Sequence, residues 1–378
     1  MIVKKKAVLH IITKLDLGGA QKSCLALIAE LQKNNSDFEI YLISGAEGEL
    51  VPEAKKLNHV FLIDSLVWEI SPKNLLLEIH NFYQVFKIMR HLKIKYHGNL
   101  IVHTHTIKAG TIGRWCAFFA GIKTRIHTIH GFGFNLYQNK LIWLIFYLTE
   151  LMNSLITTHF VCVSSQDQIA GSEILPFFLY RSSIIRAATL YQKKHDHLEK
   201  SKYLKYKIGT IASLKTGKNL FELLKAFKFA LNKDHNLQLE IIGDGPLRKP
   251  LETYLNKHNL QNQVILLGWQ ATPQIYTKNW QAFIFTSLWE GLPCAIVEML
   301  EQQIPVLSYQ VGGIGDLMPS NQLYYSGKWL DLAHAILNLK SAHNYNLTAN
   351  KPNQPSDQFY IPKMALDHIK IYQESLTP

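Results

Sequence analysis

Two glutamates stand eight residues apart in the stretch WEGLPCAIVE, with Glu290 before Gly-Leu-Pro and Glu298 after it. Carboxylates accept hydrogen bonds, so two of them can hold one ligand at two points. If the residues between them begin a helix, eight residues at helical rise span roughly 12 Å. The alternative is a loop glutamate, a proline (Pro293) in the first helical turn, and an exposed helical glutamate.

Glycines end several apolar runs at points where a helix is predicted to follow. Gly18 and Gly19 follow the first run, and Gly243 ends a later one. Glycine lets the backbone approach a ligand closely, and a helix N-terminus offers free N–H groups to an anion. A tight turn that needs no side chain is the alternative. The pattern is not GxGxxG, which argues against a dinucleotide-binding site.

Lys215 and Lys218 fall in the loop before the amphipathic segment NLFELLKAF. Positive charges at a helix N-terminus oppose the helix dipole and destabilise the helix. A bound phosphate would remove this conflict. The placement therefore favours an anion-binding site over a pair of merely solvated charges.

Several histidines could be catalytic or metal-binding residues. His130 ends the run RIHTIH just before the stretch GFGF, although a single histidine at a strand end is usually structural. The pairs His103–His105 and His195–His197 have no further ligands at a recognisable metal-binding spacing. We interpret them as strand and linker residues and predict no metal site.

The composition limits the class of protein and its partners. Of the 378 residues, 47% are hydrophobic and 18% are charged, and the net charge is +12. This is globular composition in a chain long enough for two domains, and it excludes a disordered protein. The pI near 9.3 favours anionic partners such as phosphate-bearing substrates or an acidic membrane face. No nucleic-acid-binding motif occurs and the lysines are dispersed, so we predict no nucleic acid partner.

Cysteine usage and apolar segments predict the compartment. Cys24, Cys116, Cys162 and Cys294 form no CxxC pair, which argues against a disulfide framework and favours a reducing cytoplasm. The start, MIVKKKAVLHIITKLD, lacks the cleavage site of a signal peptide. The longest apolar segment, from Leu141, contains Glu150 and Asn153 and is shorter than a membrane span. We therefore expect no membrane-spanning helix.

Short apolar runs alternate with segments of helical periodicity through both halves of the chain. The runs predict strands at 7–13, 38–44, 59–64, 99–105, 125–130 and 159–165, then at 206–213, 237–244, 263–269, 282–287 and 305–311. Such alternation implies βαβ units and parallel sheets with helices on both faces. The polar, lysine-rich residues 191–207 predict a linker. We expect an α/β protein of two facing Rossmann-like, doubly wound domains, at 1–190 and 208–355. Residues 356–378 are expected to form a helix that packs back on the first domain.

Taken together, these motifs resemble those of the family 4 glycosyltransferases of the GT-B fold. The family signature is S-x-x-E-G-x-P-x-x-x-x-E, and this chain has TSLWEGLPCAIVE followed by PVLSYQVGGIGDLM. Further matches are GGAQ, VHTHTIKAGTIGRWCA, HTIHGFGF, the Lys218 loop and GDGP. Each motif alone is weak, but six in the family's order, over residues 7 to 320, are specific.

The resemblance implies a retaining, metal-independent transfer of a hexose or N-acetylhexosamine from a nucleotide sugar, with UDP as the expected nucleotide. It places the catalytic residues His130 and Glu290 at the donor sugar and gives Glu298 the ribose hydroxyls. Other residues expected to bind the nucleotide sugar lie in loops: Gly18, Gly19, Ser213, Lys215, Lys218, Gly243, Trp269, Leu292, Pro293 and Cys294. The first domain would bind the acceptor and the second the donor. No cofactor is implied, and the chain has no Asp-x-Asp motif of the kind that holds Mg²⁺ or Mn²⁺ in glycosyltransferases of another fold.

The chain departs from the family pattern at a few positions. Ser213 stands where the family usually has an arginine, with Lys215 two positions later, and Gln303 stands where glycine is common. The family's Asn-Gly-Ile/Val-Asp at the domain link is replaced by IRAATLY. These departures concern the acceptor and the hinge more than donor binding.

Two N-terminal segments, HNFYQVFKIMRHLKIKYH and FGFNLYQNKLIWLIFYL, pair cations with large apolar residues. This composition suits an anionic bilayer surface, and ordinary buried helices with a solvated face are an equal alternative. With the net positive charge, it predicts a peripheral protein that acts on a lipid-linked, lipopolysaccharide or polysaccharide acceptor at the cytoplasmic membrane face. A soluble sugar or sugar-phosphate acceptor and a non-catalytic nucleotide-sugar-binding protein are the alternatives.

Overall fold

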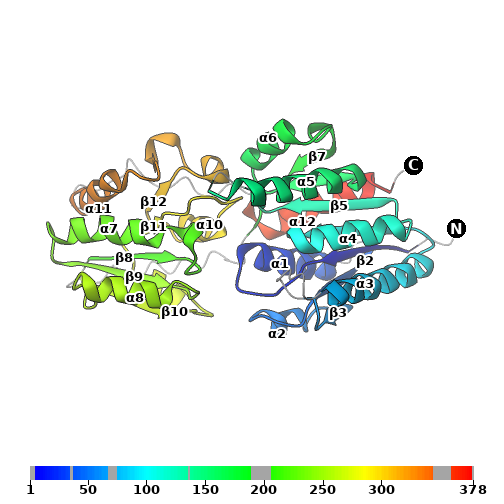
Figure 1. The fold of residues 1–378 in the computed structure, drawn as a ribbon, viewed down its shortest axis with the longest axis horizontal. Coiled ribbons are helices and arrows are strands. Elements are labelled where there is room, and N and C mark those ends of the chain that lie inside the picture. Colours follow the sequence, from blue (N-terminus) through cyan, green and yellow to red (C-terminus); the bar gives the residue numbers. More distant parts are fainter. Residues whose placement is uncertain are drawn as a thin grey trace. The chain divides into compact units, whose positions relative to one another are not determined.

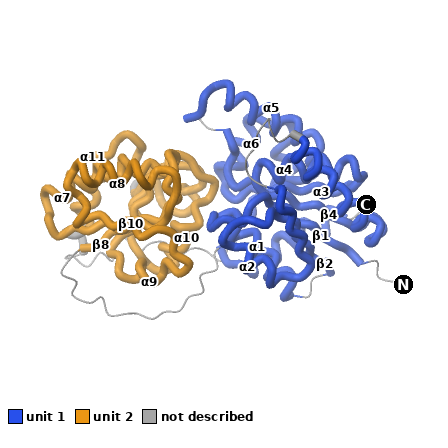
Figure 2. The backbone as a smooth tube through the Cα atoms, turned by 60° about the horizontal axis from the view of Figure 1, so that its bottom comes forward, with its two compact units in different colours: residues 1–190, 357–378 blue, residues 191–356 orange. Residues whose placement is uncertain are grey.

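The computed structural model describes residues 5–34, 37–66, 75–134, 137–188, 206–343 and 359–376. The chain divides into two compact units, residues 1–190 with 357–378 and residues 191–356 (Figure 2). Each unit is built on one parallel β-sheet with helices packed against it (Figure 1). The α/β class with two Rossmann-like sheets is therefore confirmed.

The sheet of the first unit has the strand order β3-β2-β1-β4-β5-β6-β7, with every neighbouring pair parallel. Its inner strands are almost wholly buried because helices cover both faces of such a sheet. The order reverses direction between β1 and β4, and α/β proteins bind ligands beside such a point, at the carboxyl ends of the strands. The strands are β1 (Lys6–Ile11), β2 (Phe38–Gly45), β3 (Val60–Ile63), β4 (Leu100–His105), β5 (Thr124–Ile129), β6 (His159–Cys162) and β7 (Ser182–Ile184).

Two hydrophobic cores lie on the opposite faces of this sheet. One contains residues of α1 (Gly19–Lys33) and α12 (Ile361–Glu374), and the other contains residues of α3 (Leu75–Lys95) and α4 (Ile107–Phe119). α12 comes from the far end of the chain, yet residues 357–378 belong to the first unit (Figure 2). Its Met364, Ala365 and Tyr372 are buried there. The remaining helices of the unit are α2 (Val51–Ala54), α5 (Lys140–Ile156), α6 (Ser165–Ile174) and the 3₁₀ turn η2 (Leu179–Arg181).

The second unit has the strand order β10-β9-β8-β11-β12-β13, again with every neighbouring pair parallel. Its strands are β8 (Tyr206–Ile211), β9 (Leu237–Ile242), β10 (Val264–Gly268), β11 (Ala282–Phe285), β12 (Val306–Tyr309) and β13 (Leu323–Tyr324). Its helices are α7 (Leu220–Leu231), α8 (Arg248–Lys257), α9 (Gln274–Thr277), α10 (Cys294–Glu301) and α11 (Trp329–His343). The 3₁₀ turns of the described part of this unit are η3 (Thr216–Lys218) before α7, η4 (Gly312–Asp316) after β12 and η5 (Ser320–Gln322) before β13.

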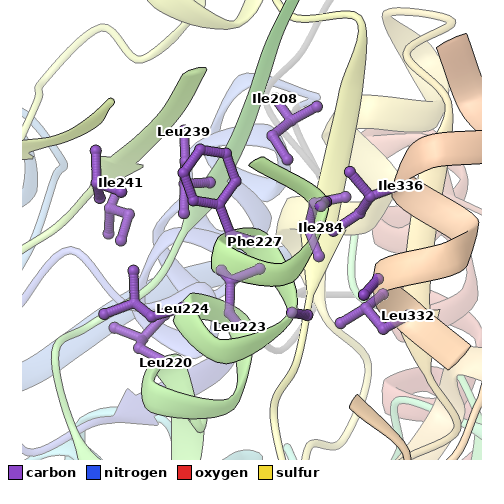
Figure 3. Packing of buried hydrophobic residues seen from close by; sticks show 14 of the residues in the cluster. Ile208, Leu220, Leu223, Leu224, Phe227, Leu239, Ile241, Ile284, Leu332 and Ile336 are labelled. Carbon is purple, nitrogen blue, oxygen red and sulfur yellow. The ribbon is translucent and has the colours of Figure 1, made fainter. Parts of the chain in front are cut away.

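Helix α7 forms the centre of this unit's core. Leu220, Leu223, Leu224 and Phe227 recur at helical spacing, so they lie on one face of the helix, and all are buried. That face packs on sheet residues such as Ile208, Leu239 and Ile284, and on Leu332 and Ile336 of α11 (Figure 3). The packing fixes the start of α7, and with it the loop that carries Lys215 and Lys218.

The structure corrects the predicted domain link. β8 begins at Tyr206, so the last two residues of the predicted linker, Tyr206 and Lys207, belong to the second sheet. They pair with Leu237 and Gln238 of β9, and the Tyr206 N–H donates to the carbonyl of Asn236 at 2.9 Å. The remaining linker residues, 191–205 with His195 and His197, lie outside the described residues.

Within the described ranges, no helix is both long and apolar enough to cross a membrane. The apolar segment from Leu141 forms α5, which has 17 residues.

Candidate functional site

Most of the predicted donor-site residues follow strands of the second sheet. Ser213, Lys215 and Lys218 follow β8, Gly243 follows β9 and Trp269 follows β10. Glu290, Leu292, Pro293 and Cys294 follow β11, and Glu298 lies in α10. The carboxyl ends of parallel strands meet at one edge of a sheet, so these loops share that edge. Trp269 exposes 41% of its surface there.

Lys218 and Glu290, 72 residues apart in the sequence, are in direct contact. The Lys218 Nζ donates a hydrogen bond to the Glu290 Oε1 and also lies 5.8 Å from the centre of the Phe285 ring. A bond from a side chain to the backbone joins the same two loops, because the Thr286 hydroxyl donates to the Lys218 carbonyl at 3.0 Å. The ammonium and the carboxylate therefore occupy one place at the sheet edge.

This contact changes the electrostatic argument made from the sequence. Glu290 supplies the negative charge that the dipole of α7 requires near Lys218, so a phosphate is not needed to explain that lysine. Both side chains are partly exposed, at 26% and 19%. Solvent screening limits such a pair to about 1 kcal/mol. Lys215 is exposed and precedes the 3₁₀ turn η3.

Two glycines in this unit are required by the backbone. Gly312 has φ +49°, and a Cβ there would fall 2.7 Å from the carbonyl carbon of Glu290 and 2.9 Å from the carbonyl oxygen of Gly291. The Gly313 N–H donates to the Gly291 carbonyl at 2.7 Å. The loop after β12 thus rests directly on the backbone that carries Glu290. Gly243 has φ +132°, and a Cβ there would fall 2.8 Å from the carbonyl carbon of Ala212, so its geometry favours the tight-turn alternative.

Helix α10 begins at Cys294, directly after Pro293. Pro293 is the N-cap with extended geometry (φ −76°, ψ 99°) and is not in the first helical turn. The reason is that its carbonyl already accepts the Ile296 N–H at 3.0 Å, which places the proline just outside the helix. Leu292 is buried, Cys294 opens the helix, and Glu298 is half-buried one turn further on. Glu290 therefore belongs to the loop and Glu298 to the helix.

In the first unit, Gly18 is the N-cap of α1 and Gly19 is its first residue, and no side chain caps this helix. Gly18 has φ −88°, which other residues adopt, and a Cβ there would meet the flexible side chain of Gln21. The turn geometry therefore does not by itself require Gly18, and the uncapped N-terminus agrees with the close-approach interpretation.

His130 directly follows β5 and is half-buried. Burial lowers the pKa of its imidazole to about 4, with a smaller contribution from His368, so the ring is neutral near pH 7. The loop after it packs on α5 through Phe134, whose ring centre lies 5.7 Å from that of Trp143. A pocket opens at this loop, lined by Thr106, Ile107, His127, Thr128, Ile129, His130, Gly131, Phe132, Gly133, Phe134, Phe146 and Glu150.

A cluster of buried histidines that the sequence did not predict lies next to His130. His10 of β1, His103 and His105 of β4 and His368 of α12 all lie in the interior. The sequence signal for this cluster was the position of three of these histidines at or near the ends of strands, but only the strand order brings them together. Within the described residues, donor atoms of His10, Cys24 and His105 lie within 4.8 Å of one another. These are ligand types for Zn²⁺ or Cu⁺, although burial raises the pKa of the Cys24 thiol and so favours its protonated form.

Helix α5 buries the polar side chains of Glu150, Asn153 and Ser154 and exposes many of its large apolar ones. Arg114, fully buried in α4, donates to both carboxylate oxygens of Glu150 at 2.8 and 3.0 Å. Asn153 is also buried and accepts from the Trp115 indole at 3.0 Å. The outer face of α5, here called the α5 apolar face, consists of large side chains that are each at least 44% exposed: Leu141, Ile142, Leu144, Ile145, Leu148, Met152 and Leu155.

Comparison with known proteins supports the resemblance seen in the motifs. The family model described as "Glycosyl transferases group 1" matches residues 192–352. The Escherichia coli UDP-Gal:alpha-D-GlcNAc-diphosphoundecaprenol alpha-1,3-galactosyltransferase is 29% identical over 74% of this chain and 73% of its own length. The poly(ribitol-phosphate) alpha-N-acetylglucosaminyltransferase of Staphylococcus aureus is 24% identical over 35% of this chain and 28% of its own length.

The fold of this chain is also similar to that of solved structures. Anabaena Alr3699/HepE in complex with UDP and glucose aligns with a TM-score of 0.80 and 16% identity, over 98% of this chain and 100% of that one. At this identity the likeness concerns the fold alone, which is the GT-B fold predicted from the motifs. The family model matched over residues 192–352 covers most of the second unit, and the motifs and the GT-B fold of the whole chain agree with it, which supports glycosyltransferase activity and is consistent with family 4.

Proposed function

We propose that the protein transfers a hexose or N-acetylhexosamine from a UDP-sugar to a lipid-linked or polysaccharide acceptor, with retention of configuration and without a metal or other cofactor. The observation that carries this proposal is the contact between Lys218 and Glu290 at the carboxyl edge of the second sheet. It puts a cation for a diphosphate beside a carboxylate for a sugar. The relatives support the choice of substrates, since one uses UDP-Gal and a diphosphoundecaprenol-linked sugar by name.

In this proposal the residues at the sheet edge bind successive parts of the donor. Glu298 accepts hydrogen bonds from the ribose hydroxyls, Lys218 balances the diphosphate charge, and Glu290 faces the sugar. The bond between the anomeric carbon and the diphosphate oxygen breaks, and a bond to the acceptor oxygen forms on the same face. The acceptor's hydroxyl proton passes to the departing phosphate, and UDP leaves. Fixed positive charge at the diphosphate stabilises the charge that develops on it.

Glu298→Ala is expected to weaken UDP-sugar binding by about 10- to 100-fold. A hydrogen bond to a charged acceptor contributes about 1.5–3 kcal/mol, and each 1.4 kcal/mol is a factor of ten. Calorimetry with UDP-glucose, UDP-galactose and their N-acetyl counterparts measures the affinity and also identifies the preferred sugar. Glu252→Ala, an exposed glutamate of α8 outside the proposed site, is the control and should bind as the wild type does. Unaltered affinity in a folded Glu298→Ala protein would overturn this site assignment.

The acceptor proposal rests on the α5 apolar face. Soluble monomers rarely expose an apolar patch of this kind unless it meets a partner or a membrane. The buried hydrogen bonds of Glu150 to Arg114 and of Asn153 to Trp115 hold the helix in this orientation. The helix therefore cannot rotate about its axis to bury its apolar side chains. With a net charge of +12, an anionic bilayer is the occupant that fits. The protein would then meet its acceptor at the inner face of the membrane.

Charged substitutions on the α5 apolar face are expected to abolish membrane binding. Wild-type protein should float with vesicles of mixed neutral and anionic lipid, and less so at high salt, because exposed charges are screened within about 10 Å at 0.1 M. Ile145→Glu with Leu148→Glu should lower the bound fraction at least tenfold, since each side chain loses burial worth about 1.5–3 kcal/mol. The control is Ile275→Glu in α9, where the isoleucine is 58% exposed compared with 56% for Ile145.

Two results would contradict the membrane proposal. Wild-type protein that stays with the soluble fraction at low and high salt, and glycosylates free sugars readily, would favour the soluble-acceptor alternative. A concentration-dependent dimer that is lost in the double variant, without any vesicle binding, would assign the α5 apolar face to a second copy of the chain.

A further inference from the structure

A continuous line of hydrogen-bonding groups runs from His130 into the interior of the first unit. The Nε2 of His130 lies 3.2 Å from the Nδ1 of His105, and the Nε2 of His105 lies 3.1 Å from the Nδ1 of His10. The Nε2 of His10 lies 3.4 Å from the hydroxyl of Tyr372. His105 and His10 thus each direct one ring nitrogen to the preceding group of the line and the other nitrogen to the following group.

The line continues past Tyr372 to a second strand pair. The Tyr372 hydroxyl lies 2.6 Å from the Nδ1 of His103, and the Nε2 of His103 lies 2.7 Å from the hydroxyl of Thr128. We call the whole line the imidazole chain, in the order His130, His105, His10, Tyr372, His103 and Thr128.

The sheet topology places the imidazole chain. β4 lies between β1 and β5, where His10 is in register with His103 and His105 with Thr128. Residues in register across parallel strands have side chains on the same face, as do residues two apart in one strand. Tyr372 reaches this face from α12, which packs beside α1. The last helix of the chain therefore completes a hydrogen-bonded line that ends at a predicted catalytic residue.

The four histidines of the imidazole chain are neutral near pH 7, because the contacts along it join their ring nitrogens to one another and to two hydroxyls, with no carboxylate among these partners. Burial lowers the pKa of His10 to about 3 and that of His130 to about 4, and it places the pKa values of His103 and His105 well below their usual range. A neutral imidazole has one N–H donor and one acceptor nitrogen. In an unbroken line, the proton position on one ring therefore sets the position on the next, and two overall arrangements exist.

Tyr372 distinguishes the two arrangements because it has a single proton to donate. Its oxygen is 2.6 Å from His103 but 3.4 Å from His10, and O–H donors bond at the shorter of these separations. The phenol therefore donates to His103, whose own N–H then faces Thr128. His10 is left to present its Nε2–H to the phenol oxygen, and its Nδ1 accepts from His105.

We propose that the imidazole chain holds His130 in the tautomer with the proton on Nε2, which leaves Nδ1 as a hydrogen-bond acceptor. His105, His10 and Tyr372 are then positioning residues, acting on the reaction through His130. The consequence for catalysis rests on the proposed function: an acceptor nitrogen can receive a sugar hydroxyl, which the other tautomer cannot do. The proton arrangement itself is independent of that function.

Nitrogen NMR of the full-length protein labelled with ¹⁵N-histidine tests the tautomer directly. His130→Gln assigns the resonances of that residue among the 17 histidines. Wild type should show neutral His130 with its proton on Nε2. Tyr372→Phe keeps the ring but removes the hydroxyl at the middle of the chain, and should convert this state to a mixture of tautomers. Tyr96→Phe is the matched control, because it removes another buried hydroxyl of the same unit, bonded to Tyr41 at 2.7 Å. It should leave His130 unchanged.

If Tyr372→Phe does not fold, Thr128→Val breaks the far end of the chain and should show the same shift. A proton on Nδ1 of His130, a charged imidazolium at pH 7, or unchanged His130 signals in a folded variant would overturn the proposal. One equivalent of zinc or copper in the purified protein by elemental analysis would also overturn it, since an ion held by His10, Cys24 and His105 interrupts the chain.

Activity separates this proposal from the proposed function. Tyr372→Phe should lower kcat about fivefold with an unchanged KM for the UDP-sugar, the factor expected when a preference worth one hydrogen bond is lost. If the tautomer shifts as expected but the wild type transfers no sugar, the imidazole chain stands and the proposed function falls. If the wild type transfers sugar normally but His130 carries its proton on Nδ1, the proposed function stands and the proposal on the imidazole chain falls.

Discussion

Replacing Lys218 by alanine is expected to lower kcat by about 10²–10³-fold, while the affinity for the sugar part of the donor changes little. Removal of one preorganised group that stabilises developing charge costs about this factor in other enzymes. Lys218 is placed for this role because its ammonium is held at Glu290, where it keeps further N–H donors for a diphosphate. Steady-state kinetics with the preferred UDP-sugar, together with calorimetry, separates turnover from binding.

Two variants make this result specific. Lys218→Arg keeps the charge and should recover part of the turnover, whereas Lys233→Ala removes an exposed lysine beyond α7 and should have no effect. Because Lys218 takes the place of a metal ion in the proposed mechanism, EDTA should leave the wild-type rate unchanged. Loss of activity in EDTA that Mn²⁺ restores, or full turnover by Lys218→Ala, would contradict the mechanism.

Much of the fold could be predicted because strands in a doubly wound sheet are apolar on both faces. The runs AVLHIIT and LQLEIIGD mark β1 and β9 for this reason. β7 and β13 were missed, and both are short edge strands, Ser182–Ile184 and Leu323–Tyr324, with no apolar run of their own. Edge strands bury little, so their sequences carry little pattern.

The orientation of α5 could not be predicted from the sequence, for a different reason. Its segment is apolar around most of the helix, so periodicity does not say which side faces water. The deciding interaction is the buried pair of Arg114 and Glu150, which are 36 residues apart. In the sequence, Glu150 indicated only that the segment does not span a membrane. In the structure, its buried pair with Arg114 orients α5 so that the α5 apolar face is exposed.

The candidate site shows the same limit of local patterns. The motif around Glu290 identified the residue, and the loop before α7 identified Lys218, but no spacing between them predicts that they touch. The histidines likewise came together through strand order, since His10 precedes His103 by 93 positions and meets it across neighbouring strands. Contacts between the ends of distant strands follow from the topology of the sheet. A sequence motif predicts such contacts only when it belongs to a family whose structure is already known.

Gly312→Ala is expected to lower kcat at least 100-fold without unfolding the protein. The residue adopts φ +49°, a region that costs an L-residue about 1–2 kcal/mol. In addition, the new Cβ would fall 2.7 Å from the carbonyl carbon of Glu290 and 2.9 Å from the carbonyl oxygen of Gly291. Backbone cannot yield as a flexible side chain would, so the loop that carries Glu290 has to move. A displacement of about 1 Å at a catalytic group can cost about 10²-fold in rate.

Gly315→Ala is the matched control, because it adds the same methyl group to the same 3₁₀ turn, η4, with nothing within 4 Å of the new Cβ. Thermal unfolding and transfer kinetics are measured for both variants. The expected pattern is a small loss of stability and a large loss of turnover for Gly312→Ala, with near wild-type values for Gly315→Ala. This difference is expected because η4 contacts the backbone of Glu290 at residue 312, where there is no room for a side chain. A side chain at that position would therefore displace the Glu290 carboxylate. Equal turnover in the two variants would show that the loop after β12 does not hold Glu290 in place.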